Sequence, residues 1–377
     1  MCHLEITHAS LGESTAVRGR RGAGARPDQG DGIPWSQETE GSGRRPTIWA
    51  QVFGMAVAIL IAGLAGCGDR DGAPAGFQAL ATEQSGILLS AAYGGDGGAV
   101  IVGGQIGGGD GLLMRWDGHA LDTVPTPGAH AFWWVTAVGA NEFFVAGETG
   151  EVHRFDGQTL AAVDAGAPAS ATLFGIWGPS ADELWTVGGS FSNTGAKRVI
   201  RHLSGGQWSG VDSPADVAPE TTYFKVWGSS ASDVWIVGDG GVVLHWNGAT
   251  LTRDARVTGA ERFVTVHGCD ARDVWAVGGT GSAQVRAFDG TTWSVVDATT
   301  AQPLSAVACA GGDVLVGGAF GYAAQISGGK FSALSTPASI GDLFIHGIAR
   351  AGAHALAVGG DLLAGPGAPY HGFVLQR

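Results

Sequence analysis

Short apolar runs alternate with polar, glycine-rich turns along the chain from residue 76 to its end. Between residues 223 and 254 the runs read YFKVW, DVWIV, VVLHW and TLTRD, and each is short and rich in β-branched and aromatic residues, as strands are. Asn247-Gly248 separates the third run from the fourth, and Asp-Gly or Gly-Gly pairs return at the same place in other segments. Such pairs supply the positive φ angles of tight two-residue hairpins, so the pattern predicts antiparallel neighbouring strands.

One glycine marks the same place in seven consecutive segments, directly after the second apolar run. These glycines are Gly103, Gly147, Gly188, Gly238, Gly278, Gly318 and Gly359, at intervals of 44, 41, 50, 40, 40 and 41 residues. A period near 40 that carries four strands is typical of a β-propeller blade. The sequence therefore predicts an all-β fold, a seven-bladed β-propeller of four-stranded antiparallel blades that occupies residues 76–377.

The last segment stops after its third strand-like run, HGFVLQR at residues 371–377. Its missing fourth run is found at the other end of the repeat region, where GFQALAT at residues 76–82 parallels KFSALST at residues 330–336. We expect this N-terminal strand, residues 76–83, to complete the last blade. Closing the ring in this way removes the exposed sheet edges that would otherwise aggregate.

The N-terminal part of the sequence predicts where in the cell the protein is located. Residues 1–43 have no apolar period and are interpreted as an unstructured extension or a start site placed too far upstream. Residues 44–66 begin with two arginines and end in Leu-Ala-Gly before Cys67, which resembles a bacterial lipoprotein signal in which Cys67 is lipidated. Residues 67–75 then form a linker, and the outer membrane of a Gram-negative bacterium is the expected location. An uncleaved transmembrane anchor over residues 47–66 is the alternative.

Charge and motifs exclude some classes of function. The net charge is −13, and residues 67–377 hold 15 basic and 28 acidic side chains. Such a surface repels nucleic acid and anionic lipid headgroups, so no nucleic-acid partner is expected. The glycine-rich stretches at residues 94–98 and 103–111 match neither a dinucleotide fingerprint nor a P-loop, and no motif predicts a cofactor.

The turn after the first strand carries an aromatic residue or a histidine in five of the seven segments: Tyr93, Trp177, Trp227, His267 and His346. Equivalent positions in a closed ring lie on one face, so these side chains could form a collar that binds a sugar, a peptide or a partner loop. Alternatively, they pack between neighbouring blades. Trp185, Trp235 and Trp275 of the second strands belong to the core and favour this packing interpretation.

Cys269 and Cys309 each lie nine residues before the repeat glycine of their own segment, so they occupy one position in adjacent blades. Near the axis such positions can approach the roughly 5–6 Å between Cα atoms that a disulfide requires, and export favours the bond. Two small buried side chains are the alternative. The spacing of these cysteines relative to His267 and His346 matches no usual zinc motif, so no metal site is predicted.

Two further features concern polar side chains. An acidic residue five positions before the repeat glycine returns as Asp233, Asp273 and Asp313, which favours a structural turn over acid–base catalysis. The longest repeat interval contains an insertion at residues 190–198. Long rim loops often carry recognition, although surface loops also tolerate insertions. The candidate contact residues of this loop are Phe191, Asn193, Lys197 and Arg198.

The segments VWGSSASDVW at residues 226–235 and GVVLHWNG at residues 241–248 resemble the WD-repeat-like and sialidase-repeat-like (BNR-like) propeller modules of secreted bacterial proteins. The resemblance implies the architecture alone, because propellers host many unrelated functions. With the lipoprotein signal, it leads us to expect a monomeric, lipid-anchored, non-catalytic envelope scaffold that binds protein or carbohydrate. An envelope hydrolase or lyase of the sialidase type is the alternative, and a spacer without a soluble ligand is a third possibility.

Overall fold

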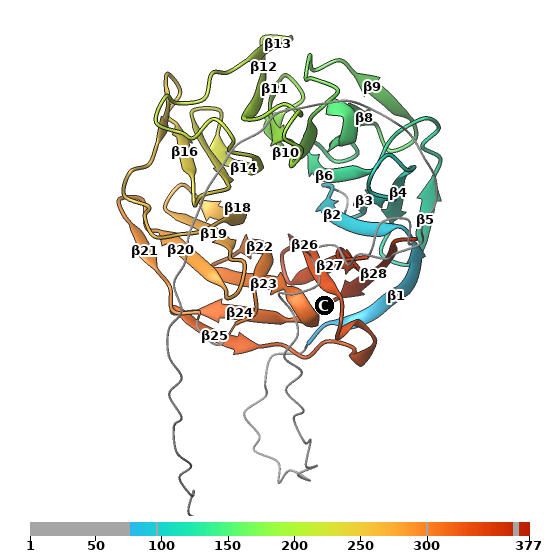
Figure 1. The fold of residues 1–377 in the computed structure, drawn as a ribbon. Coiled ribbons are helices and arrows are strands. Elements are labelled where there is room, and N and C mark those ends of the chain that lie inside the picture. The colour runs from blue at the N-terminus through green and yellow to red at the C-terminus, as the bar shows by residue number, and fades with distance from the viewer. Residues whose placement is uncertain (1–75, 96, 299–300, 365–368) are drawn as a thin grey trace, which may run out of the picture. The chain divides into compact units, whose positions relative to one another are not determined.

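The computed structural model describes residues 76–95, 97–298, 301–364 and 369–377. In these residues the chain forms strands β1 to β28, which pair into seven four-stranded antiparallel sheets. Figure 1 shows the sheets arranged around a central axis, and each sheet has one edge strand innermost, which is called its first strand. The predicted seven-bladed β-propeller is therefore confirmed.

The first three blades contain these strands in order: β2 (Ile87–Tyr93), β3 (Ala99–Gly104), β4 (Gly111–Trp116) and β5 (Leu121–Val124); β6 (Phe132–Ala137), β7 (Phe143–Gly147), β8 (Val152–Phe155) and β9 (Leu160–Val163); β10 (Thr172–Ser180), β11 (Glu183–Gly189), β12 (Val199–Ser204) and β13 (Gln207–Gly210). The next three contain β14 (Tyr223–Ser230), β15 (Asp233–Gly238), β16 (Val243–Trp246) and β17 (Leu251–Arg253); β18 (Phe263–Asp270), β19 (Asp273–Gly278), β20 (Gln284–Phe288) and β21 (Trp293–Val295); β22 (Leu304–Ala310), β23 (Asp313–Gly318), β24 (Ala323–Ser327) and β25 (Lys330–Ala333). The core lies between the blades, where their apolar faces pack on one another.

The seventh blade joins the two ends of the described chain. It contains β26 (Phe344–Ala351), β27 (His354–Gly360), β28 (His371–Gln376) and, as its outer strand, β1 (Gln78–Ser85). Strand β1 pairs antiparallel with β28, from Gln78 opposite Gln376 to Ser85 opposite His371. The prediction that the N-terminal strand completes the last blade is confirmed.

The repeat glycine is required by a close approach of backbone. A Cβ atom added to Gly188 would lie 2.0 Å from the carbonyl oxygen of Thr172, and one on Gly359 would lie 1.8 Å from that of Phe344. In all seven blades the nearest atom is a carbonyl oxygen at or just before the start of the first strand, at 1.8 to 2.6 Å. The glycine therefore lets the first strand cross over the end of the second.

Every first strand also has a β-bulge at one place, directly after the residue that pairs with the repeat glycine. In blade three, Leu173 pairs with Gly188 and Gly175 with Val187, which leaves Phe174 as the extra residue. The seven extra residues are Leu89, Trp133, Phe174, Phe224, Val264, Ser305 and His346. A bulge bends its strand and increases the local twist, so the same bend recurs around the ring.

The turns between third and fourth strands are of two kinds. The Gly205-Gly206 and Gly328-Gly329 turns are the predicted two-residue hairpins, with positive φ at both glycines. The Asx-Gly turns are longer, and their positive φ is confined to the glycine. At Asp117, for example, the carboxylate accepts hydrogen bonds from the backbone N–H groups of His119 and Ala120, which stabilises a four-residue loop.

Candidate binding site

A cavity of about 250 Å³ opens at the end of the central channel where the first strands finish. All seven blades contribute to its wall. Of the predicted collar, Tyr93, Trp177, Trp227 and His267 line this cavity. Trp134 of β6 and Arg350 of β26 also line it, and neither occupies the turn position that defines the predicted collar.

His346 does not belong to this group. It is the bulge residue of blade seven and lies near the opposite end of its strand, where its Nδ1 is 2.7 Å from the carbonyl oxygen of Leu89. Ala349 takes the position of Trp177, because Ala349 pairs with Leu356 as Trp177 pairs with Trp185. The collar prediction was wrong at His346, since register and not distance from the turn sets which side chains are equivalent.

The two tryptophans of the collar also pack between blades. A Cβ atom on Gly228 would lie 2.6 Å from Cη2 of Trp177, so the indole of blade three rests on the glycine of blade four. Trp227 in turn covers Gly268 of blade five. Each tryptophan therefore fills the space above a glycine in the next blade and presents another part of its ring to the cavity.

Burial changes the protonation of both histidines. Burial, helped by the positive charge of Arg350, lowers the pKa of His267 to about 4. The backbone N–H of Cys309 donates to Nδ1 of His267 at 3.3 Å, which assigns the ring proton of the neutral imidazole to Nε2. Burial and the charge of Lys225 lower the pKa of His346 to about 3, against the opposing effect of its hydrogen bond to Leu89. Both rings are neutral at physiological pH.

Lys225 lies in the mostly apolar strand β14, the first strand of blade four, and the residue is 2% exposed. Its Nζ lies 4.3 Å from the ring centroid of Trp134, two blades away, where it makes a cation–π contact. Gly175, at the same register in the blade between them, lies against the backbone of β14, where an added Cβ atom would be 2.9 Å from the Cα of Lys225. Burial lowers the pKa of Lys225 to about 7. A charged residue inside the motif YFKVW was the available sequence signal for this contact.

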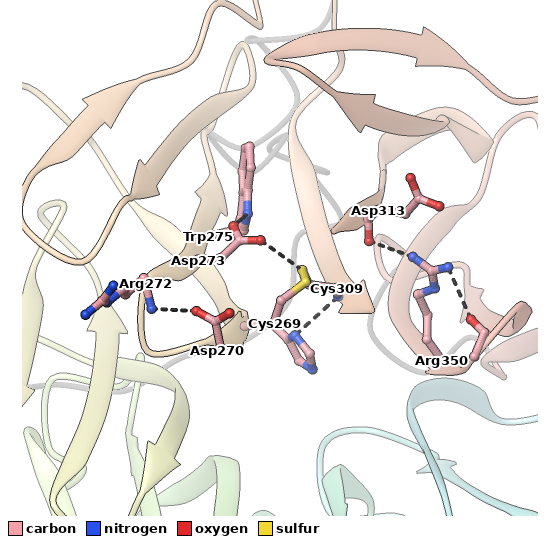
Figure 2. Close-up of a disulfide and its surroundings, with 10 residues drawn as sticks. Cys269, Asp270, Arg272, Asp273, Trp275, Cys309, Asp313 and Arg350 are labelled. Atoms are coloured by element: carbon pink, nitrogen blue, oxygen red, sulfur yellow. Dashed lines mark hydrogen bonds between the residues drawn. A yellow bond between two sulfur atoms is a disulfide. The ribbon is translucent and has the colours of Figure 1, made fainter. Parts of the chain in front are cut away.

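Cys269 and Cys309 are joined by a disulfide between blades five and six, with their Cα atoms 5.0 Å apart. Figure 2 shows Asp273 beside them: its Oδ2 is 3.7 Å from Sγ of Cys309, and its Oδ1 accepts a 2.5 Å hydrogen bond from Trp275 Nε1. The carboxylate and the two sulfurs lie within 4.8 Å of one another, and the disulfide occupies both sulfurs.

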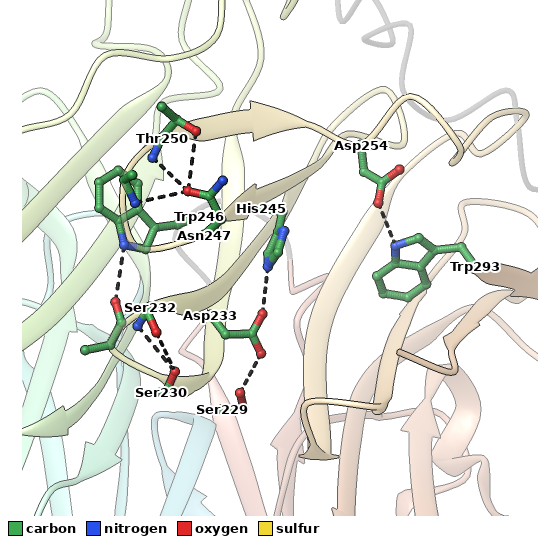
Figure 3. A network of polar contacts seen from close by, with 12 residues as sticks. Ser229, Ser230, Ser232, Asp233, His245, Trp246, Asn247, Thr250, Asp254 and Trp293 are labelled. Atoms are coloured by element: carbon green, nitrogen blue, oxygen red, sulfur yellow. Dashed lines mark hydrogen bonds and ion pairs between the residues drawn. The ribbon is translucent and has the colours of Figure 1, made fainter. Parts of the chain in front are cut away.

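The recurring acidic residue, which is Glu142 in blade two and Glu183 in blade three, has a different partner from the local backbone of a turn. In four blades it binds a side chain of the third strand rather than local backbone: Glu142 with Arg154 (2.7 Å), Glu183 with His202 (2.5 Å), Asp233 with His245 (2.7 Å) and Asp313 with Gln325 (3.0 Å). Figure 3 shows the pair in blade four, where Ser229 Oγ also donates to Asp233. Blade five has Ala287 at the partner position, which leaves Asp273 to contact Trp275.

The insertion in blade three lies on the face opposite the cavity, between β11 and β12. Phe191 is 61% exposed, and its ring lies 5.6 Å from that of Phe174 and 5.9 Å from that of Phe224. Lys197 and Arg198 donate to the carbonyl oxygens of Ser190 and Val217 and so hold the loop in place. Asn193 is exposed at its tip.

Cys67 and the N-terminal apolar stretch lie outside the described residues. Within the described part of the chain, no helix has the length and apolar character needed to cross a membrane.

The sialidase-type arrangement is not assembled at the cavity. The described residues that line it include one arginine, Arg350, and one tyrosine, Tyr93, but no carboxylate. The arginine cluster and the Tyr-Glu pair that the resemblance to sialidases would require are therefore not brought together there.

No family model matches the chain, and no curated protein sequence matches it significantly. Solved structures share its fold. YCF48 bound to D1 peptide has a TM-score of 0.56 at 15% identity and covers 81% of this chain and 99% of its own. YCF48 from Cyanidioschyzon merolae has a TM-score of 0.58 at 15% identity, with 80% and 98% covered. The extracellular domain of the putative one-component system BT4673 from B. thetaiotaomicron has a TM-score of 0.56 at 14% identity, with 79% and 39% covered.

These similarities place the chain in the β-propeller class by fold. At identities of 14% and 15% they define architecture alone, because propellers of one shape serve many functions.

Proposed function

We propose that the protein is a lipid-anchored, non-catalytic scaffold of the cell envelope that binds an apolar segment of another envelope protein. The binding face is the one formed by the turns between second and third strands, opposite the cavity. The observation that supports this proposal most is the exposure of Phe191. A phenylalanine that is 61% exposed and contacts two further aromatic rings offers apolar area on an already ordered surface, which favours protein binding.

A second exposed aromatic residue on this face supports the proposal. Phe320 is 55% exposed and follows the second strand of blade six. Its φ of 57° lies in the left-handed region, where a bulky residue is strained. Blade two has Thr149 at this position with a φ of 55°, and blade four has Gly240 with a φ of 66°, so the left-handed conformation belongs to the turn of the repeat. In blade six this turn holds an aromatic ring exposed on the face that also carries Phe191.

The negative net charge of the chain favours basic partners over acidic ones. With a net charge of −13, the protein repels acidic partners and attracts basic ones during encounter. We therefore expect an apolar segment flanked by Lys or Arg. Membrane attachment through Cys67 would hold the propeller beside partners in the same membrane, and the outer membrane is the proposed location.

Photo-cross-linking in the native host tests the binding face. p-Benzoylphenylalanine is introduced at Phe191, at Phe320 and, as a control, at Val295, which is 73% exposed on the outer strand of blade five. We expect one protein adduct to form at both phenylalanine positions and not at Val295. The same adduct at Val295, or none at Phe191 and Phe320, would contradict the proposal.

Intact mass spectrometry of the membrane-extracted protein tests the anchor. A mass that begins at Cys67 and includes acyl chains is expected, and C67S should release the propeller from the membrane fraction. A mass that retains the apolar segment before Cys67 would replace the lipid anchor with a transmembrane one.

A further inference from the structure

The cavity on the other face combines aromatic walls with a positive charge. Its wall contains four large aromatic side chains, those of Tyr93, Trp134, Trp177 and Trp227, and one ionised side chain, that of Arg350. Its volume of about 250 Å³ is slightly below the roughly 300–1,000 Å³ of drug-sized sites. These dimensions suit a ligand with a single ring and a small substituent.

The charge of Arg350 is not neutralised by an ion pair within the described residues. Its Nη1 donates to the carbonyl oxygen of Asp313 at 2.6 Å and its Nη2 to that of Gly352 at 3.3 Å, as Figure 2 shows. These bonds use two of its five N–H groups, and its Nε is buried without a partner. The carboxylate of Asp313 interacts electrostatically with Arg350 from outside the cavity, and neither it nor the carboxylate of Asp273 lines the cavity. In a protein of net charge −13, a cavity whose ionised lining residue is an arginine favours an anion.

The other polar groups of the wall are mostly donors. The neutral ring of His267 accepts at Nδ1 from Cys309, so its Nε2–H is a donor, and it has no partner among the described residues. Burial raises the pKa of Tyr93 to about 12, which keeps its hydroxyl protonated. Neutral sugars need acceptors as well as donors, and the side chains of this wall supply only the hydroxyls of Tyr93 and Thr136 as acceptors.

We propose that this cavity binds a small organic acid that carries its carboxylate on a flat ring. The carboxylate accepts hydrogen bonds from the guanidinium of Arg350 and from Nε2 of His267. The ring stacks on the indoles of Trp177 and Trp227 or of Trp134, whose faces supply apolar contact. This site lies on the opposite face from the proposed protein-binding surface and does not depend on it.

Isothermal titration of the full chain with matched probes tests the proposal. Benzoate has the ring and the charge, benzamide has the ring without the charge, and acetate has the charge without the ring. We expect benzoate to bind at about millimolar or lower concentration, with benzamide and acetate each at least about tenfold weaker, a difference of about 1.4 kcal/mol. Equal binding of benzoate and benzamide, or no binding of benzoate at about 10 mM, would overturn the proposal.

Variants of Arg350 test whether this residue supplies the positive charge that binds the carboxylate. R350M should weaken benzoate binding at least about tenfold and leave benzamide binding unchanged. R272M is the matched control, because Arg272 is exposed on a turn of the same face but does not line the cavity, and it should bind benzoate as the wild type does. If R350M fails to fold, two measurements still test the proposal. One is benzoate binding by R350K, which keeps the charge, and the other is the comparison of benzoate with benzamide in the wild type. Wild-type affinity in a folded R350M would refute the role of Arg350.

Discussion

Trp227 of blade four lies over Gly268 of blade five, so closely that a Cβ atom on that glycine would be 2.4 Å from Cη2 of the indole. The same relationship joins Trp177 to Gly228. These contacts link consecutive blades beside the channel, where each first strand faces its neighbour.

Replacing both Trp177 and Trp227 by alanine should therefore unfold the protein. Truncation of a buried tryptophan such as Trp227 costs about 3–5 kcal/mol, and the loss of the partly buried Trp177 adds to it, so the sum approaches the stability of a typical domain. Thermal unfolding followed by circular dichroism measures the effect. F191A is the control, because Phe191 is exposed and its removal should change stability by less than about 0.5 kcal/mol. A double variant that folds normally would show that these rings serve the cavity and not the packing.

Alanine at a repeat glycine should destabilise its blade. In G188A the new methyl group would meet the carbonyl oxygen of Thr172, and relieving that overlap requires a backbone shift that costs about 1–3 kcal/mol or more. Gly281 is a suitable control, since a Cβ atom there has nothing within 4 Å. Urea unfolding of G188A and G281A gives the comparison, and equal midpoints would argue against the close approach.

The disulfide between Cys269 and Cys309 should contribute about 2–4 kcal/mol, because it links residues 40 positions apart and restricts the unfolded chain. Mass spectrometry with and without reduction detects the bond as a gain of two hydrogen atoms. The double variant C269A/C309A should show the same mass in both conditions and a lower free energy of unfolding. Unreduced wild-type protein that already carries two free thiols would contradict this prediction.

Lys225 should make stability depend on pH above neutrality. Its pKa is about 7 in the folded protein and near 10.5 in the unfolded chain, so between these values the unfolded state binds more protons. Stability is then full above about pH 10 and falls as the pH is lowered towards 7, by an amount on the order of 3 kcal/mol. K225M lacks this term and should be more stable than the wild type at pH 7.

Urea unfolding of K225M and the wild type at pH 7 and pH 10 isolates this contribution, because the other titrating groups are common to both proteins. The buried groups that face Lys225 are Trp134, which does not titrate, and His346, whose pKa of about 3 keeps it neutral throughout this range. A constant difference between the two proteins across these pH values would show that the amine is not desolvated.

The blade count, the closing strand and the position of the repeat glycine could be predicted from the sequence, because a blade is a local unit. Each apolar run pairs with the next one along the chain, and the glycine that follows the second run reports a steric requirement within its own blade. The closing strand was predictable for the same reason, since GFQALAT repeats the pattern of a fourth strand. The Asx-Gly turns were predicted too short, because the pair alone does not reveal that the side chain will accept two backbone hydrogen bonds.

The candidate sites depend on contacts that no local pattern contains. Its place near a turn groups His346 with the collar, but the hydrogen-bond register, which the bulge in the first strand sets, places it at the other end of the channel. Lys225 of blade four contacts Trp134 of blade two, and the charge of Arg350 in blade seven acts on His267 in blade five. Residues so far apart in the chain come together only because seven first strands converge on one axis, and ring closure, not sequence spacing, determines which of them meet.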